Sequence, residues 1–305
     1  MAKFEITMLG CGSGIPTAKH MTSAQIVNIN ERLFLVDCGE GTQTQIWKYR
    51  VKLTNLDAIF ISHMHGDHFF GLIPLLSSIG LMLARTEDLH IYMPIVMVEP
   101  IQYDLDKYCY LPYKVILHGI DTTAREVLYE NSTMTVESIP LEHKTPCMGF
   151  LFKEKPKANI LLPEKCKEYG INCTEFRKIK EGADYITPDG RTIPNSELTK
   201  PSDYIPKSYA YCSDTSYCPA LAEQIHGVDL LYHEATFVES EKDMAATAGH
   251  STASQAADIA LRANAKQLAI GHYSIRYNDE DELLAEAKSV FSNTVATQEG
   301  MVISI

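Results

Sequence analysis

The sequence predicts a layered α/β domain over residues 1–305. Short segments rich in β-branched and apolar residues alternate along the chain with segments of helical periodicity. Polar residues directly follow several of the apolar segments. Strands interleaved with helices favour a domain in which helices cover sheets. With 305 residues, 45% of them hydrophobic and 22% charged, the chain can bury a large core.

The predicted strands are short apolar runs whose composition favours extended backbone. The segment 57–62 is almost wholly apolar, as expected of a buried strand, whereas 133–139 alternates between apolar and polar residues like a half-buried one. Strands are predicted at 4–9, 33–36, 57–62, 133–139, 208–213, 229–234, 267–272 and 301–305.

Helices are predicted between these strands. Thr252 and Gln255 match the capping box T-x-x-Q, and apolar residues over 256–263 then recur at helical spacing. The segment 279–291 begins with acidic residues and carries Lys288 near its end, an order that suits the helix dipole. Two further helices are predicted at 41–50 and 70–84.

The charge balance excludes one broad class of protein. Lysine and arginine number 27 against 39 aspartates and glutamates, which gives a net charge of −12. A uniformly basic nucleic-acid binder is therefore excluded, whereas a local basic patch on an acidic body is not.

Cysteine usage and the apolar runs predict a soluble cytoplasmic protein. The eight cysteines are scattered without a C-x-x-C pair, which favours buried free thiols over a zinc ribbon or a disulfide scaffold. The N-terminus lacks the apolar stretch of a secretory signal. Glycines and a proline interrupt the longest apolar run, 69–84, so we expect a buried helix and no membrane partner.

The segment 153–207 differs from the rest of the chain. It holds six of the 14 prolines and lacks regular apolar periodicity. Its nine lysines and two arginines against nine acidic residues give it a charge of +2, so the remainder carries −14. Two interpretations are open: a solvated surface excursion, or an arm that meets an anionic partner.

The clearest chemical signal is the motif S-H-M-H-G-D-H at 62–68, directly after a predicted strand. It places three imidazoles and one carboxylate within six residues at a strand end. Imidazole and carboxylate are the ligands of hydrolytic zinc and similar divalent metals. A chance cluster of this composition is far less expected than a metal site.

The motif H-x-H-x-D-H resembles the signature of the metallo-β-lactamase superfamily. The resemblance implies an αββα sandwich, in which helices flank two β-sheets, with 153–207 as a protruding inserted arm. It also implies further ligands downstream. His143, Asp214 and His272 occur in the required order, each at the end of a predicted strand, where α/β layers place their active sites.

Seven ligands suit two metal ions rather than one. The resemblance implies one set for each ion and one bridging carboxylate: His63, His65 and His143; Asp67, His68 and His272; and Asp214 between them. Zinc is the expected metal, two ions per subunit, and manganese or iron would also fit. Asp67 is in addition placed to accept a proton from water as general base.

The likeness is closer to one family, ribonuclease Z, and covers essentially the whole chain. It rests on MLGCGSGIPT, LFLVDCGEGTQTQI, YHEATF, AGHST and GHYSIRY. The resemblance implies that Glu234 of HEAT and His250 of HST help protonate the leaving 3′ oxygen or hold the scissile phosphate. The implied reaction removes the 3′ trailer from precursor tRNA. The cut lies 3′ of the discriminator base and leaves a tRNA 3′-hydroxyl and a trailer 5′-phosphate.

The arm lies where ribonuclease Z carries its tRNA-binding exosite. The family's short form is a homodimer in which one subunit's arm serves the other's site, and this length predicts that form. The stretch 168–182 departs from the family because it lacks a Gly-Pro-rich tip. Phosphate contacts require local cations. The candidates are Lys165, Lys167, Arg177, Lys178 and Lys180 in the arm, and Ser274 and Arg276 beside the last histidine.

Several alternatives remain open. The same centre would serve a small-molecule phosphodiesterase or an arylsulfatase of the superfamily. A non-catalytic RNA-binding member is disfavoured because it has no need of seven ligands. Trp47 suits either RNA stacking or packing in a core or interface. The glycines at 10, 12 and 14 predict a tight loop near the metal site rather than a dinucleotide-binding turn.

Overall fold

The computed structural model describes residues 3–83 and 85–305, which form two compact units. The first unit comprises the chain up to Tyr129 together with Val136–Phe152 and Lys207–Ile305. The second comprises Glu130–Thr135 and Lys153–Pro206. All seven predicted metal ligands belong to the first unit.

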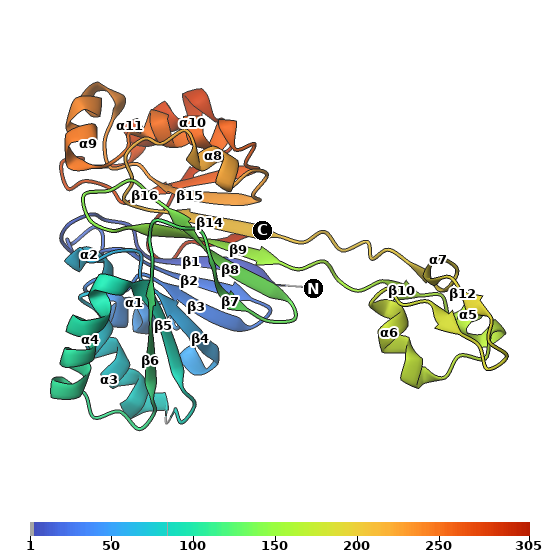
Figure 1. Ribbon diagram of the computed structural model, residues 1–305. Helices are drawn as coiled ribbons and strands as arrows, with labels where there is room; N and C mark the ends of the chain where they lie inside the picture. The colour runs from blue at the N-terminus through green and yellow to red at the C-terminus, as the bar shows by residue number, and fades with distance from the viewer. Residues whose placement is uncertain (1–2, 84) are drawn as a thin grey trace. The chain divides into compact units, whose positions relative to one another are not determined.

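Two seven-stranded sheets form the centre of the first unit, with helices on both outer sides (Figure 1). This arrangement is the predicted αββα sandwich. In spatial order, the first sheet contains β18 (Val302–Ser304), β1 (Phe4–Gly10), β2 (Ala24–Ile29), β3 (Arg32–Val36), β4 (Leu56–Phe60), β5 (Leu89–Pro94) and β6 (Val115–Ile120). The second contains β17 (Thr294–Ala296), β16 (Gln267–Gly271), β15 (Leu230–Glu234), β14 (Ser208–Cys212), β9 (Met148–Glu154), β8 (Met134–Pro140) and β7 (Val127–Glu130).

Aromatic side chains fill the space between the two sheets. Phe34 of the first sheet lies 5.8 Å from Phe152 of the second, and Phe60 lies 5.3 Å from Phe150, measured between ring centroids. The residues that flank Phe34 along β3 point the other way, into the core under the helices. Strands buried on both faces explain why these segments are apolar almost without interruption.

Two groups of helices cover the sandwich (Figure 1). The first sheet is covered by α1 (Thr42–Lys48), α3 (Leu72–Leu83) and α4 (Ile95–Tyr108), with the short α2 (Gly66–Phe69) before α3. The second sheet is covered by α8 (Leu221–Gln224), α9 (Lys242–Ala248), α10 (Ala253–Arg262) and α11 (Asp281–Val290). The capping box predicted for α10 is present in full, with Thr252 and Gln255 each bonding the other's backbone N–H.

Helix α3 is buried on one face only. Gly66–Leu83 is long and apolar enough to cross a membrane by composition. However, Leu72, Leu76 and Ile79 pack into the core beneath the first sheet, which is the behaviour of a core helix. The expectation of a buried helix holds for this face, whereas Met82 on the other face is 59% exposed. The predicted end of this helix, Ala84, lies outside the described residues.

The strands that lead into the predicted site run parallel within each sheet. In the first sheet β3 to β6 are parallel neighbours, and in the second sheet β14 to β17 are. Parallel strands end at the same edge of a sheet, so the residues that follow β3, β4, β14, β15 and β16 can meet there.

The second unit is built from very short elements around a small core of its own. The elements are β10 (Ile160–Leu161), α5 (Pro163–Glu168), α6 (Phe176–Lys180), β11 (Tyr185–Ile186), β12 (Thr192–Ile193), α7 (Asn195–Leu198) and β13 (Thr199–Lys200). Five apolar residues are buried together: Cys166, Ile171, Ile179, Ile193 and Leu198. A wholly solvated excursion therefore does not describe this segment.

Candidate metal centre

The first predicted ligand set comes together at the ends of β4, β8 and β14. His63 Nε2 lies 3.0 Å from His65 Nδ1, which lies 3.2 Å from His143 Nε2. Asp214 Oδ2 lies 3.5 Å from His63 Nε2 and 3.9 Å from His143 Nε2. His63 and Asp214 are buried, whereas His65 is exposed, so this side of the cluster is open to solvent.

The second predicted set lies beside the first and shares Asp214 with it. His68 Nε2 and His272 Nε2 are 3.3 Å apart, and Asp214 Oδ1 is 3.2 Å from each. Asp67 Oδ2 lies 3.4 Å from His272 Nε2 and 3.6 Å from His68 Nε2. The two oxygens of Asp214 thus face different sets, which is the arrangement required of a bridging carboxylate.

These separations fit divalent metal ions. Donor atoms bound to one tetrahedral zinc ion at about 2.0–2.1 Å stand about 3.3 Å from each other. The nitrogen and oxygen atoms of both sets lie close to that spacing, with the nitrogens of neighbouring imidazoles facing one another. The donor set therefore fits two ions in the predicted grouping. Ligation itself stays a prediction.

The hydrogen bonds around the centre fix the histidine tautomers. Asp37 Oδ2 accepts from His68 Nδ1 at 2.7 Å, and the Gly249 carbonyl accepts from His143 Nδ1 at 2.7 Å. Ser62 Oγ donates to Asp37 at 2.9 Å, so it can accept from His63 Nδ1 at 3.0 Å. Because each Nδ1 carries a proton, each of these rings directs the lone pair of Nε2 at the centre.

His272 is held in the same way through a chain of two bonds. Thr236 Oγ1 donates to Glu234 Oε2 at 2.6 Å and can therefore accept from His272 Nδ1 at 2.9 Å. Four of the five predicted histidine ligands thus present Nε2 to the centre, and His65 presents Nδ1.

Asp37 is a functional residue that the sequence reasoning missed. It is fully buried, and besides His68 and Ser62 it accepts a hydrogen bond from the Tyr211 hydroxyl at 2.6 Å. It holds one predicted ligand and, through Ser62, a second. A signal was available, because Asp37 directly follows an apolar strand, and Asp214 follows one after a single residue.

The backbone at three of these positions is strained in the same way. Asp37 and His272 directly follow β3 and β16, and Asp214 follows β14 after one residue. Their φ values are 55°, 62° and 56°. The left-handed region is unfavourable for residues with a side chain, by roughly 1–2 kcal/mol. Asp and His tolerate it better than most residues. The sharp turn at each strand end brings the side chain into the centre.

Burial and neighbouring charges set the protonation of the centre. Burial lowers the pKa of the His63, His65 and His143 imidazoles, which favours the neutral form that binds metal. Burial alone would raise the pKa of Asp214, but the neighbouring imidazoles, foremost that of His272, outweigh it and hold the pKa well below its usual range.

Glu234 and His250 form an ion pair at the edge of the centre, where the resemblance places them. His250 Nδ1 donates to Glu234 Oε1 at 2.8 Å, and His250 lies within reach of Asp214 and His272. Burial alone would lower the pKa of His250, but the Glu234 carboxylate outweighs it and raises the pKa to about 9. Glu234 is buried and also accepts from the backbone N–H of Thr215. The pair therefore holds a protonated imidazole near the ligands.

The remaining predicted contacts lie outside the ligand cluster. Ser274 follows His272 by two residues, and its Oγ accepts from the Arg276 N–H. Arg276 is half-exposed and lies 3.6 Å from Glu241. Its role toward phosphate stays a prediction.

Four of the five predicted arm cations are exposed and Lys165 is partly exposed, and three of the five pair with neighbouring glutamates. The pairs are Lys165 with Glu168 at 2.8 Å, Arg177 with Glu181 at 2.9 Å, and Lys178 with Glu175 at 3.2 Å. Lys167 and Lys180 are also exposed.

Family models match two parts of the chain. A model described as Anti-Pycsar protein Apyc1 matches residues 4–155, and one described as Beta-lactamase superfamily domain matches residues 204–273. Among solved structures, human tRNase Z, short form, superposes with a TM-score of 0.71 at 24% identity over 99% of both chains. YhfI of Bacillus subtilis, titled a metallo-beta-lactamase fold protein, superposes with a TM-score of 0.71 at 22% identity over 99% of this chain and all of its own. These structures confirm the metallo-β-lactamase fold.

Relatives of known name resemble the chain over its whole length. Ribonuclease Z of Bacteroides fragilis is 50% identical, and that of Parabacteroides distasonis is 46% identical, each over the full length of both chains. The two signals that first pointed to this result, the cluster at 62–68 and the HEAT and HST motifs, lie together in the structure. The chain therefore belongs to the ribonuclease Z family.

Proposed function

We propose that this protein is a two-zinc endoribonuclease that removes the 3′ trailer from precursor tRNA by cutting 3′ of the discriminator base. Members of the ribonuclease Z family are phosphodiester hydrolases that process tRNA 3′ ends, and the chain shares that assignment. The observation that carries the finer proposal is the set of seven donor atoms in two groups around Asp214, with the Glu234–His250 pair beside them. The products would be a tRNA 3′-hydroxyl and a trailer 5′-phosphate.

Each residue of the centre has a role that follows from its position. His63, His65 and His143 would hold one ion, and the second ligand set the other, with Asp214 shared. When bound, such a pair of ions supplies a hydroxide near neutral pH and stabilises the charge that develops on the phosphate. Asp67 is ionised and so has a lone pair to accept a proton. Burial alone would raise its pKa, but the adjacent His272 and His68 outweigh it and hold the pKa below its usual range.

His250 is suited to serve the leaving group. A 3′ oxygen that leaves as an alkoxide is a strong base, so a proton delivered to it lowers the barrier. Glu234 keeps His250 protonated at neutral pH and fixes its ring through Nδ1. With Nδ1 engaged by Glu234, Nε2 of His250 is the atom left to donate a proton to the leaving oxygen.

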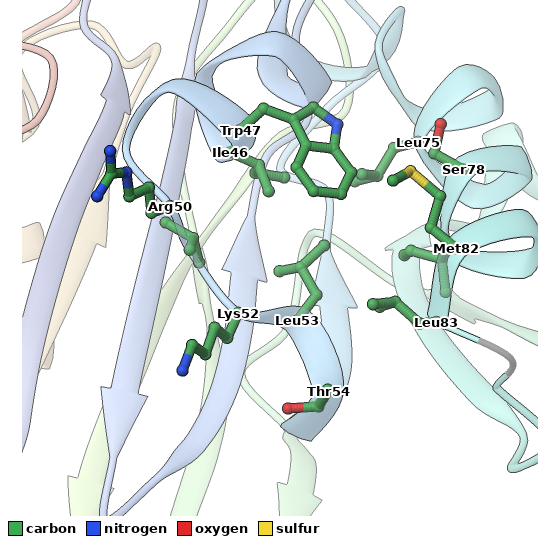
Figure 2. Close-up of a pocket in the computed structure, with 12 residues that line it drawn as sticks. Ile46, Trp47, Arg50, Lys52, Leu53, Thr54, Leu75, Ser78, Met82 and Leu83 are labelled. Atoms are coloured by element: carbon green, nitrogen blue, oxygen red, sulfur yellow. The ribbon is translucent and has the colours of Figure 1, made fainter.

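We also propose that the chain forms the homodimer of the family's short form, in which one subunit's arm serves the other's centre. An apolar groove between α1 and α3 supports such a contact (Figure 2). Trp47 and Met82 line the groove and are 48% and 59% exposed. The groove is lined almost wholly by apolar atoms, and a two-fold contact would remove the same patch from water on both subunits. The eight free thiols accord with the proposed cytoplasmic location.

Sedimentation velocity tests the dimer. Trp47→Glu is expected to shift the protein from dimer to monomer, because a carboxylate cannot be buried unpaired in an apolar contact. Leu261→Glu is the matched control, since Leu261 is a comparably exposed leucine on α10, in the helical layer of the other sheet. A wild-type protein that sediments as a monomer at micromolar concentration would contradict the proposal.

Cleavage of an end-labelled precursor tRNA, with the cut site mapped, tests the reaction. Wild-type protein should cut after the discriminator base and contain about two zinc ions per chain by elemental analysis. Asp67→Ala should be inactive, whereas Asp121→Ala, which removes an exposed carboxylate elsewhere, should not. An absence of tRNA cleavage combined with rapid hydrolysis of bis(p-nitrophenyl) phosphate would move the function to a small-molecule phosphodiesterase.

A further inference from the structure

The loop between β1 and β2, residues 11–23, contacts the centre directly. The Gly14 N–H donates to Asp67 Oδ2 at 2.7 Å. The same loop is bonded to the residue after His272, because Ser13 N–H donates to the Tyr273 carbonyl at 3.0 Å and Tyr273 N–H to the Cys11 carbonyl at 2.9 Å. The position of this loop therefore controls one oxygen of the carboxylate assigned as ligand and base.

A buried histidine ties the loop to two glutamates from distant parts of the chain. His20 is 8% exposed. Its Nδ1 lies 3.0 Å from Glu299 Oε2, and its Nε2 lies 2.8 Å from Glu280 Oε1. Glu280 also accepts from Lys19, and Glu299 Oε1 accepts from the backbone N–H groups of Cys11 and Met21 at 3.1 and 3.0 Å.

Both nitrogens of His20 face carboxylate oxygens, and this decides the charge on the ring. A neutral imidazole has one N–H, so one nitrogen would direct a lone pair at a carboxylate. The imidazolium donates to both. Together with Lys19 it also balances the two carboxylates, which a neutral ring would not.

The other groups around His20 do not offset this balance. The Tyr273 ring packs on the imidazole with 5.4 Å between centroids, and burial raises the pKa values of Tyr273 and Cys11, so both stay neutral. Burial alone would lower the pKa of His20, but Glu299 and Glu280 outweigh it and raise the pKa above its usual value.

We infer that His20 is a positioning residue for the hydrolytic reaction: its imidazolium clamps the 11–23 loop to Glu280 and Glu299 and so holds the Gly14 N–H on Asp67. The inference rests on the proposed role of Asp67 in phosphodiester hydrolysis. His20 touches neither the substrate nor a predicted ligand in this arrangement, so its effect passes through the loop. The arm belongs to the other compact unit, so binding of tRNA should not depend on the clamp.

Two substitutions separate the charge of His20 from its bulk. His20→Gln removes the charge and carries both of its N–H donors on one nitrogen, whereas its amide oxygen can only accept. His20→Arg keeps a permanent charge and several donors that can reach both. We expect His20→Gln to lower kcat about tenfold with KM for precursor tRNA unchanged, and His20→Arg to restore most of the rate. His226→Gln, at an exposed histidine, is the control and should match wild type.

The pH profile supplies a readout that a merely structural role would not change. As the pH rises through the pKa of His20, the wild-type clamp loses its charge, whereas the arginine clamp keeps it. The ratio of wild-type to His20→Arg activity should therefore fall at alkaline pH, measured at saturating substrate with thermal unfolding and metal content recorded for each variant.

Several outcomes would overturn the inference. The first is an unchanged kcat in His20→Gln. The second is a loss of kcat in His20→Gln that His20→Arg does not relieve although both variants are folded. The third is a pH profile of activity that has the same alkaline limb in wild type and in His20→Arg. If His20→Gln does not fold, the pH comparison between wild type and His20→Arg decides alone. The same series run on bis(p-nitrophenyl) phosphate keeps this test separate from the identity of the substrate, because the clamp should affect both substrates alike.

Discussion

The metal centre and the arm differ in how far their ionisable side chains are buried. At the centre, side chains such as His68 and Asp214 are almost completely buried, and each is fixed by a further hydrogen-bonding partner. In the arm, cations such as Arg177 stand in solvent and pair with acidic residues one helical turn away. Buried charges interact strongly and keep one geometry, whereas exposed pairs contribute little and rearrange easily. The difference suits the roles proposed above, in which the centre performs the chemistry and the arm binds a polyanion of variable shape.

Asp214→Asn tests the centre and should have the largest effect. The amide nitrogen cannot serve the second ion, so one ligand set is left without its shared carboxylate. We expect kcat to fall about a thousandfold or more on both precursor tRNA and bis(p-nitrophenyl) phosphate. Elemental analysis should show less metal per chain. Full metal content with full activity would contradict the bridging role.

His250→Gln should have the next largest effect and should depend on the leaving group. Loss of a general acid costs about a hundredfold or more when the leaving group needs a proton. Nitrophenolate leaves without one, so hydrolysis of bis(p-nitrophenyl) phosphate should fall far less. Steady-state rates on the two substrates provide the comparison. Equal losses on both would assign His250 to phosphate binding instead.

Removal of the arm should lower activity on tRNA without changing activity on a small phosphodiester. Phe152 and Tyr209 lie side by side, with 6.0 Å between ring centroids, so a short Gly-Ser linker can replace residues 153–206. We expect tRNA cleavage at low substrate concentration to fall about a hundredfold, because phosphate contacts are lost, while bis(p-nitrophenyl) phosphate hydrolysis stays at wild-type level. Unchanged tRNA cleavage would contradict the tRNA-binding role of the arm.

Mixing this deletion variant with Asp67→Ala asks which subunit an arm serves. On precursor tRNA at low substrate concentration, Asp67→Ala alone should be inactive and the deletion variant alone should keep only about a hundredth of wild-type activity. If the arm acts on the partner's centre, mixed dimers regain one working site, about a quarter of wild-type activity after random exchange of subunits. No recovery would mean that each arm serves its own centre.

The smallest expected effect is a gain of affinity. Replacing Glu168, Glu175 and Glu181 together by Gln releases Lys165, Lys178 and Arg177 from their pairs. We expect KM for precursor tRNA to fall about threefold at low salt, with a steeper dependence of KM on salt concentration. Glu282→Gln, an exposed glutamate on α11, is the control and should not change KM. An unchanged salt dependence would place the RNA elsewhere on the arm.

The same contrast explains what the sequence could reveal. Four predicted ligands lie within residues 63–68, and this motif carries the resemblance to the metallo-β-lactamase superfamily. The other three follow apolar strands in the order that the resemblance implies. Asp37 also follows an apolar strand but has no metal-binding residue next to it in sequence. Only its contacts with Ser62 and His68 show its role.

Elements without a clear sequence pattern were not predicted. Strands β2, β5, β6 and β9 were not predicted, nor was α4, which contains Pro100. The small core of the arm is assembled from elements two to six residues long, so no periodicity can develop in the sequence. The prediction of buried thiols was wrong for Cys173, which is exposed on the arm, and for Cys109 and Cys218, which are partly exposed.

The hydrogen bonds on the Nδ1 atoms give the centre a spectroscopic signature. The imidazole protons of His63, His68, His143 and His272 each lie between a ring nitrogen and a fixed oxygen. Protons bonded in this way and shielded from water exchange slowly with solvent and resonate far downfield in a proton NMR spectrum. Four such signals would report that both halves of the sandwich have assembled around the centre. Their loss would reveal local opening without substrate, label or turnover.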